Sequence, residues 1–310
     1  MAFRLGLAGL CTSHPRRWVP IIRELSAAGG LEIDIVAAWD SGEIRPSGFT
    51  AQFCREMEIP CALEKLSDMS DLVDGVIVHT ANWDRHVEQA GVFAEVGKAV
   101  LIDKPLAGNL CDARQLLEWA AAGRRITGGS GLRFAREIRD YLARPTGQRG
   151  ELHTAFGGCG TDDFFYGIHA YAMLLALMGP GVRSVEYLGR TRQKLLKINW
   201  HDGNAGLLAI GQAAKLPFHL TAVSTATVEQ IQVAPAGIYR ALLETCLPYL
   251  CGRVENPPLP MDVLLEPELA ALAARRSWLS GGEVLLSDLR QDDPGYDGAR
   301  FAAEYRQAQK

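Results

Sequence analysis

The tripeptide Asp103-Lys104-Pro105 combines residue types that could stabilise a developing negative charge. It follows the apolar run 99–102, which has the composition of a buried parallel strand. Pro105 disfavours the helical region for Lys104, so the lysine leaves the strand in an extended conformation. Ligands of open α/β sheets bind at the edge formed by the carboxyl ends of the strands. The sequence predicts an ammonium group there, although a lone Lys-Pro pair is more typical of a surface turn.

A histidine in the second half of the chain supplies the complementary chemistry. His169 lies in an apolar segment predicted to be helical, 163–178, and Tyr166 precedes it by three residues on the same face. Histidine titrates near neutrality and suits proton transfer, while a nearby lysine ammonium would stabilise an oxyanion. Taken alone, His169 is more typical of a core residue and Tyr166 of packing. Together with Lys104 they are the candidate catalytic residues.

The elements that must position Lys104 alternate between strand and helix. Strands are predicted at 3–9, 33–39, 74–79, 99–102 and 125–130, with helices ending near residue 28 and at 49–58, 84–96 and 109–122. Such alternation is typical of a parallel sheet covered by helices on both faces. The segment Gly128-Gly129-Ser130-Gly131 breaks the pattern and predicts a hinge. We therefore expect an α/β protein whose residues 1–130 form a Rossmann domain with a doubly wound parallel sheet.

Residues 131–310 follow a different pattern. Strands are predicted at 151–158, 183–191, 194–200, 205–213, 217–225 and 227–233, and helices near 134–143, 163–178, 237–250 and 265–279, before a polar tail. Consecutive strands predict an antiparallel or mixed sheet in a second, α+β domain. Since few helices are left to cover its second face, we expect an open-faced sheet that binds substrate and forms a homodimer or homotetramer.

Composition excludes several classes of protein. The chain has 310 residues, is 48% hydrophobic and carries a net charge of −4 without a basic stripe, so we expect no nucleic-acid partner. No apolar stretch approaches the ~20 residues of a membrane span. The seven cysteines show neither Cys-x-x-Cys pairs nor metal-ligand spacing. These features predict a cytoplasmic protein with reduced thiols and no metal site.

The turn after the first strand is where a dinucleotide would bind. It reads Gly9-Leu10-Cys11-Thr12-Ser13-His14 and keeps only the first glycine of the G-x-G-x-x-G fingerprint, with Cys11 crowding the phosphate position. The helix start and the hydroxyls of Thr12 and Ser13 could hold an anion, and an ordinary helix cap is an equal alternative. Asp40 ends the second strand, where an acid binds a ribose diol and repels a 2′-phosphate. Asp40 therefore favours NAD over NADP, and Arg45 could soften this preference.

Several motifs recur in an order that resembles the Gfo/Idh/MocA family of glucose–fructose oxidoreductase and inositol dehydrogenase. They are the run 78–86, Asp103-Lys104-Pro105, Gly131-Leu132-Arg133-Phe134 and Gly167-Ile168-His169. The resemblance implies an NAD- or NADP-binding Rossmann domain and a sugar, cyclitol or related substrate held between the domains. It also implies roles for individual residues: Lys104 and His169 match the family's active-site pair, and Asn82 and His86 match the segment beside the nicotinamide. The predicted cofactor contacts are thus Gly9, Cys11, Thr12, Ser13, Asp40, Thr80, Asn82, His86, Asp103 and Lys104.

The chain also departs from this family. Phe165 and Ala172 stand where many members carry aspartates, and Asp162 and Asp163 lie too far upstream to share a helix face with His169. Trp83 and Phe165, with Arg133 beside the hinge, are the predicted substrate contacts besides His169. The favoured hypothesis is an NAD(P)-dependent oxidoreductase that moves a hydride between nicotinamide and a hydroxyl or keto group of a sugar, cyclitol or sugar acid. A catalytically silent sensor or scaffold, or a net non-redox reaction with retained NAD, is the alternative.

Overall fold

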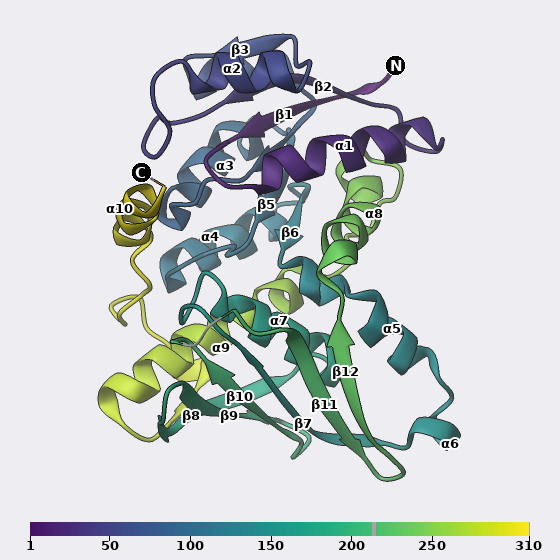
Figure 1. Cartoon of the computed structure of the whole chain (residues 1–310), viewed down its shortest axis with the longest axis vertical. Coiled ribbons are helices and arrows are strands. Elements are labelled where there is room, and N and C mark those ends of the chain that lie inside the picture. The colour runs from purple at the N-terminus through teal and green to yellow at the C-terminus, as the bar shows by residue number, and fades with distance from the viewer. Residues whose placement is uncertain (213–214, 310) are drawn as a thin grey trace.

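The N-terminal half is built on a six-stranded parallel sheet in the order β3-β2-β1-β4-β5-β6 (Figure 1). The computed structural model describes residues 1–212 and 215–309. The strands are β1 (Phe3–Ala8), β2 (Ile33–Trp39), β3 (Cys61–Leu63), β4 (Gly75–Val78), β5 (Ala99–Asp103) and β6 (Ile126–Gly129). Because the strand order reverses between β1 and β4, the carboxyl ends of these strands border the crevice in which doubly wound folds bind ligands.

Helices cover both faces of this sheet, which explains why β4 and β5 are buried along their whole length. They include α1 (His14–Ala27), α2 (Phe49–Glu56), α3 (His86–Ala94) and α4 (Leu110–Ala121), with short turns η1 (Leu66–Met69) and η2 (Trp83–Arg85). The predicted α/β class is confirmed, and the helices and strands lie close to their predicted bounds. The three-residue strand β3 was not predicted, because it is too short to show a periodic pattern.

The second half forms a seven-stranded sheet in the order β12-β11-β7-β10-β9-β8-β13. Its strands are β7 (Leu152–Cys159), β8 (Val182–Arg190), β9 (Lys194–Trp200), β10 (Ala205–Ile210), β11 (Phe218–Ser224), β12 (Val228–Val233) and β13 (Glu283–Leu285). Among the strands that the structure describes here, only the β7–β10 pair is parallel, so the predicted mixed sheet is confirmed. The strand predicted at 205–213 ends at Ile210, and residue 213 lies outside the described residues.

The helices after residue 130 pack against both halves of the molecule. Following η3 (Gly131–Phe134), these are α5 (Arg136–Ala143), α6 (Thr146–Arg149), α7 (Gly167–Met178), η4 (Pro235–Gly237), α8 (Ile238–Leu250) and α9 (Met261–Ser280). α7 and α9 cover one face of the second sheet (Figure 1). α8 instead packs Leu242, Leu243 and Leu247 into the core of the first sheet. The strands of the two sheets thus lie on either side of residue 130, whereas α8 packs with the first sheet. The predicted domain boundary stays a prediction.

The prediction of a polar tail after residue 280 is wrong, because this segment is folded. Residues after α9 form β13, η5 (Leu286–Asp288) and the helix α10 (Gly298–Ala308). α10 carries only a narrow apolar face, so its sequence alone shows a weak helical pattern. It is positioned by contacts with residues more than 200 positions earlier in the chain. In the described ranges, no helix combines the length and apolar composition needed to cross a bilayer.

Candidate active site

Lys104 lies directly after β5 and is almost completely buried, with 4% of its surface exposed. Its Nζ donates a hydrogen bond to the backbone oxygen of Phe165 at 3.1 Å and lies 3.1 Å from the centroid of the Phe165 ring. Burial lowers the pKa of Lys104 to about 8, and the carboxylates of Asp103 and Asp162 oppose that shift. At neutral pH the group is therefore mainly an ammonium, held by a carbonyl and an aromatic face.

His169 is oriented by a serine that the sequence did not reveal as a site residue. Ser130 follows β6, the neighbour of β5, and its Oγ lies 2.7 Å from Nδ1 of His169. The same Oγ accepts the backbone N–H of Leu132 at 3.2 Å. Burial, followed by the charges of Lys104 and His14, lowers the pKa of His169 well below its usual value. The imidazole is therefore neutral at pH 7 and able to accept a proton.

Tyr166 connects the lysine and the histidine. Its ring centroid lies 5.7 Å from Nζ of Lys104 and 5.9 Å from the centroid of the His169 ring. Burial raises the pKa of Tyr166, so its hydroxyl stays protonated. The structure thus brings together the three residues predicted to be catalytic, at the carboxyl edge of the parallel sheet and the start of α7.

The carboxylate of Asp162, which was not among the predicted site residues, also lies in this region. Asp162 lies upstream of α7, which begins only at Gly167, so it does not share a helix face with His169. The Asp162 carboxylate lies in the preceding turn and accepts the backbone N–H groups of Phe164 at 2.9 Å and Tyr166 at 3.1 Å. Burial raises its pKa, against the effect of the Lys104 ammonium. The sequence signal that could have placed Asp162 in the site is its ability to form an Asx turn, since helical spacing does not apply before α7 begins.

Asp103 is the centre of a buried histidine cluster. Its Oδ2 bonds Nδ1 of His14 and lies 3.6 Å from Nδ1 of His79, while Oδ1 accepts the N–H of Lys104 at 2.7 Å. Burial alone would raise the pKa of Asp103, but His14 and His79 hold it well below its usual range. The side chain is thus engaged with the protein, and its predicted contact with a cofactor stays a prediction.

The turn after β1 keeps the features that hold a pyrophosphate. Gly9 has φ +84°, and a Cβ there would lie 2.5 Å from the backbone nitrogen of Thr80. Ser13 caps α1 without a side-chain cap hydrogen bond, and the first turn of α1 carries no acidic residue. The amino end of α1 therefore favours an anion. This donor set fits the phosphates of a dinucleotide.

Asp40 faces the same turn from the end of β2. Its Oδ2 accepts the backbone N–H of Leu10 at 2.6 Å and its Oδ1 that of Gly42 at 2.9 Å. A cavity of about 500 Å³ lies beside it, with Gly48, Thr50 and Leu63 among its lining residues. Each carboxylate oxygen keeps a free lone pair, so the residues at this end fit an adenosine and its ribose.

Cys11 and Thr12 are turned toward the protein. The sulfur of Cys11 accepts the backbone N–H of Ala81 at 3.2 Å, and burial raises the pKa of this thiol to about 12. The hydroxyl of Thr12 accepts the N–H of His14 at 3.2 Å. Ser13 alone of the predicted turn residues exposes its side chain. The cysteine packs against Ile44 and Ala81, in the crevice between the loops.

The residues predicted after β4 have protein partners for their polar atoms in this structure, and their contact with a nicotinamide stays a prediction. His86 is 0% exposed, and its two ring nitrogens lie 2.6 Å from the oxygen of Thr80 and 2.8 Å from that of Pro105. The Thr80 hydroxyl donates to Gln89 at 2.6 Å. Asn82 is buried and donates to Glu43 at 2.9 Å. These side chains fasten loops together, because their polar atoms already have protein partners.

Two predicted substrate contacts, Trp83 and Arg133, are buried in this structure. The Trp83 ring centroid lies 6.4 Å from that of Phe165, whose ring covers Lys104. Trp83 is buried, donates to the oxygen of Tyr296 at 3.0 Å and packs against Phe164. Arg133 is buried with its Nη1 unpartnered among the described residues. Burial lowers the pKa of Arg133 to about 10, opposed by the acids Glu266 and Glu268 of α9. Both side chains are enclosed by protein in this structure, and Trp83 also lines a cavity of about 280 Å³ with Asp162 and Phe301. Their contact with a substrate stays a prediction.

Glu268 supports the lysine loop from behind. Its Oε1 accepts the backbone N–H of Leu106 at 2.9 Å, two residues after Lys104. Burial raises the pKa of Glu268 to about 8 from 4.5, so the folded protein holds it protonated at neutral pH. The unfolded chain releases this proton at lower pH. The free energy of unfolding therefore falls as the pH rises from about 4.5 to about 8.

We expect Glu268→Gln to stabilise the protein increasingly between pH 4.5 and pH 8.5, since glutamine keeps the accepting oxygen without the charge. Each unit of pKa shift corresponds to about 1.4 kcal/mol, so the gain at pH 8.5 is on the order of a few kcal/mol. Urea unfolding at both pH values measures it. Glu255→Gln, at an exposed position, is the matched control. An effect of Glu268→Gln that does not change with pH would contradict the prediction.

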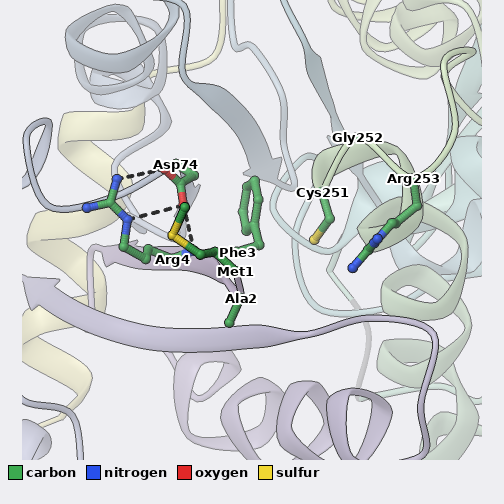
Figure 2. Close-up of a pocket in the computed structure, with 8 residues that line it drawn as sticks. All are labelled: Met1, Ala2, Phe3, Arg4, Asp74, Cys251, Gly252 and Arg253. Carbon is green, nitrogen blue, oxygen red and sulfur yellow. Dashed lines mark hydrogen bonds and ion pairs between the residues drawn. The ribbon is translucent and has the colours of Figure 1, made fainter.

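A second cavity lies at the opposite edge of the sheet. Figure 2 shows it between the start of β1 and the end of α8, with a volume of about 530 Å³. Arg4 and Asp74 pair there through contacts of 2.7 and 3.2 Å, while Cys251 and Arg253 line the other wall. It lies at the amino ends of the strands, where this fold class does not place its ligands. The site is therefore assigned to the carboxyl edge.

Fold and site together define a protein of the dinucleotide-binding type, with an acid after β2 and a lysine after β5 facing a histidine of the mixed-sheet half. Residues 3–128 match the model of the family GFO_IDH_MocA, described as an oxidoreductase family with an NAD-binding Rossmann fold. The resemblance predicted from the sequence is confirmed for these residues, which make up less than half of the chain.

Similar proteins agree with this assignment. YceM of Salmonella typhimurium carries a provisional name as an oxidoreductase. It is 28% identical to this chain over 156 residues, which cover 48% of this chain and 47% of that protein. The match thus spans about half of that relative's length. Scyllo-inositol dehydrogenase from Lactobacillus casei has a TM-score of 0.75 at 15% identity, covering 93% of this chain and 99% of the other. GenD2 from gentamicin A biosynthesis, in complex with NAD, has a TM-score of 0.74 at 18% identity, covering 92% of this chain and 96% of the other. Identities this low show a shared fold.

Proposed function

We propose that this protein is an NAD-dependent oxidoreductase that transfers a hydride between nicotinamide and a hydroxyl or keto group of a sugar, cyclitol or sugar-acid-like substrate. The observation that carries the proposal is the arrangement of Lys104, Tyr166 and His169 around one point at the carboxyl edge of the Rossmann sheet. The family match to an NAD-binding oxidoreductase domain supports it.

The chain's own residues supply acid–base chemistry and charge stabilisation. For His169 to accept a proton at Nε2, its Nδ1 must carry the hydrogen and donate to Ser130, whose Oγ retains a free lone pair. The Lys104 ammonium stabilises the oxygen that becomes negative as the substrate hydroxyl loses its proton. A bound nicotinamide supplies hydride transfer. The Asp162 carboxylate holds the turn that carries Tyr166.

The direct test is an assay of nicotinamide absorbance with a panel of cyclitols, aldoses and sugar acids. We expect one class of these compounds to be turned over with NAD. Binding of a panel compound without any turnover would instead support the silent sensor. That second function is favoured by one observation, the contact of Phe165 with Lys104, because the ring covers the ammonium on one side.

For the cofactor, we expect wild type to bind NAD more tightly than NADP, because the Asp40 carboxylate opposes a 2′-phosphate. Asp40→Asn keeps the side-chain size and an accepting oxygen for Leu10, and should shift the preference toward NADP by about tenfold. Isothermal titration with both nucleotides measures this. Tighter binding of NADP by wild type contradicts the prediction.

For assembly, we expect a homodimer or larger closed oligomer formed through the sheet face opposite α7 and α9. Figure 1 shows these two helices on one side of the sheet. Exposed apolar side chains occur on four strands of this sheet: Phe156, Leu188, Leu195 and Val228. Val228 is 69% exposed and Phe156 45%. Exposed apolar side chains spread over several strands of one sheet are typical of an interface. A monomer in sedimentation at micromolar concentration contradicts the prediction, and Phe156→Glu should dissociate the oligomer.

A further inference from the structure

The C-terminal helix α10 fills the crevice at the carboxyl edge of the parallel sheet. An apolar cluster contains Cys11, Ile44, Ala81 and Ala302, with Phe301 and Tyr305 packed against it. The first three residues lie in the loops after β1, β2 and β4, the strands that border the crevice. Ala302 of α10 is 0% exposed. Figure 1 shows α10 on the side toward which β1 points. The helix thus lies over the loops that hold a dinucleotide in this class of fold.

The amino end of α10 is fixed to the loop after β4. The carboxylate of Asp84 accepts the backbone N–H groups of Gly298 at 2.9 Å and Ala299 at 3.0 Å. A Cβ at Gly298 would lie 2.7 Å from Oδ1 of Asn82 and 2.9 Å from the nitrogen of Trp83. The negative charge of Asp84 favours a helix amino terminus, and glycine permits the close approach. These contacts specify where α10 docks.

The apolar face of α10 also reaches the candidate active site. The Phe301 ring stacks on the Phe165 ring with centroids 4.3 Å apart, and Phe165 in turn contacts Nζ of Lys104. The opposite face is polar and exposed, with an ion pair of 2.8 Å between Arg300 and Glu304. α10 is therefore an amphipathic helix whose apolar side matches the crevice and the aromatic rings beside it.

We propose that α10 is an internal occupant of the dinucleotide crevice and must leave it before NAD can bind, an inference that rests on the proposed function. The helix and a dinucleotide cannot occupy the same loops at once. Docking of α10 therefore reduces the apparent affinity for NAD to the intrinsic affinity multiplied by the fraction of molecules in which the crevice is open. An isolated helix of this length is marginal in water, so a released α10 loses its helical hydrogen bonds.

The test places one charge on each face of the helix in the full chain. Ala302→Glu puts a carboxylate into the apolar cluster and should expel α10, which tightens NAD binding by about tenfold or more in isothermal titration. Ala303→Glu makes the same change one residue further on, at an exposed position, and should leave the affinity unchanged. In wild type, NAD should abolish the hydrogen-exchange protection of residues 298–308.

A chain ending at Asp297 provides a second variant, with its folding checked by circular dichroism. It should bind NAD at least as tightly as Ala302→Glu does. Equal or weaker NAD binding by Ala302→Glu, with α10 still protected when NAD is bound to wild type, overturns the proposal and leaves the oxidoreductase function standing. Failure of NAD to bind wild type and both variants overturns this proposal together with the proposed cofactor.

Discussion

Lys104→Ala and His169→Ala should each lower turnover by about 100-fold or more while leaving folding and NAD affinity nearly unchanged. This magnitude is typical of a positioned oxyanion donor and of a general base. Lys104 is the buried ammonium at the edge of the sheet, and His169 is the neutral imidazole held by Ser130. Steady-state rates on a substrate from the panel measure the effect. Lys65→Ala and His201→Ala, at exposed positions, are the matched controls.

The pH profile distinguishes the two roles. Because burial lowers the pKa of Lys104 to about 8, its ammonium is present below that pH and is lost above it. Turnover should therefore fall as the pH rises through about 8, in wild type and in His169→Ala alike. Lys104→Ala should not show this decrease in turnover above pH 8. Ser130→Ala should cause a smaller loss, since Ser130 orients His169. Tyr166→Phe should also cause a smaller loss, since it removes only a hydroxyl and keeps the ring beside His169.

A different set of results would contradict the enzyme hypothesis. If wild type turns over none of the panel, yet binds one compound equally well with and without the Lys104 side chain, the enzyme hypothesis fails. The silent sensor then takes its place. Retained full activity in Lys104→Ala would show that the predicted oxyanion contact is wrong.

Gly128→Ala should destabilise the protein by at least about 4 kcal/mol or prevent folding. Gly128 lies in β6 with φ +140° and pairs with Ile102 of β5. A Cβ there would lie 1.9 Å from the backbone oxygen of Ile102, so the two strands would have to separate next to Lys104. Urea unfolding and soluble yield measure the loss.

Gly123→Ala is the matched control for backbone strain. Gly123 has φ +74°, but a Cβ there meets nothing within 4 Å. Its substitution should cost only about 1–2 kcal/mol, the usual penalty for a left-handed residue. Similar losses for both variants would show that the close approach of β5 and β6 contributes nothing beyond the strain.

The sequence by itself determined the alternating strands and helices of the first half, because each element is encoded by local periodicity and by turn residues. It also determined that Lys104 ends a buried strand. The positions of Lys104 and His169 in recognisable motifs were sufficient to predict that they form a pair. The mixed sheet followed from consecutive strand-like runs in the second half.

The tertiary structure decided which polar groups remain available to a ligand. His86 and Asn82 match the motif, but their polar atoms are paired with neighbouring loops. Ser130 and Asp162 carry no motif, and they entered the site because the end of β6 and the turn before α7 meet there. Hydrogen bonds between separate elements depend on distances that local periodicity does not encode.

The helix α10 is the clearest case in which contacts between distant parts of the chain, not local periodicity, determine the structure. Its residues have the composition of a polar tail, and a helix this short is barely stable alone. It forms because Asp84 binds its first turn across 214 positions of chain and because the loops after β1, β2 and β4 bury Ala302. The sequence specified the chemistry at the strand ends, whereas long-range packing decided what covers it, since burial depends on residues far apart in the chain.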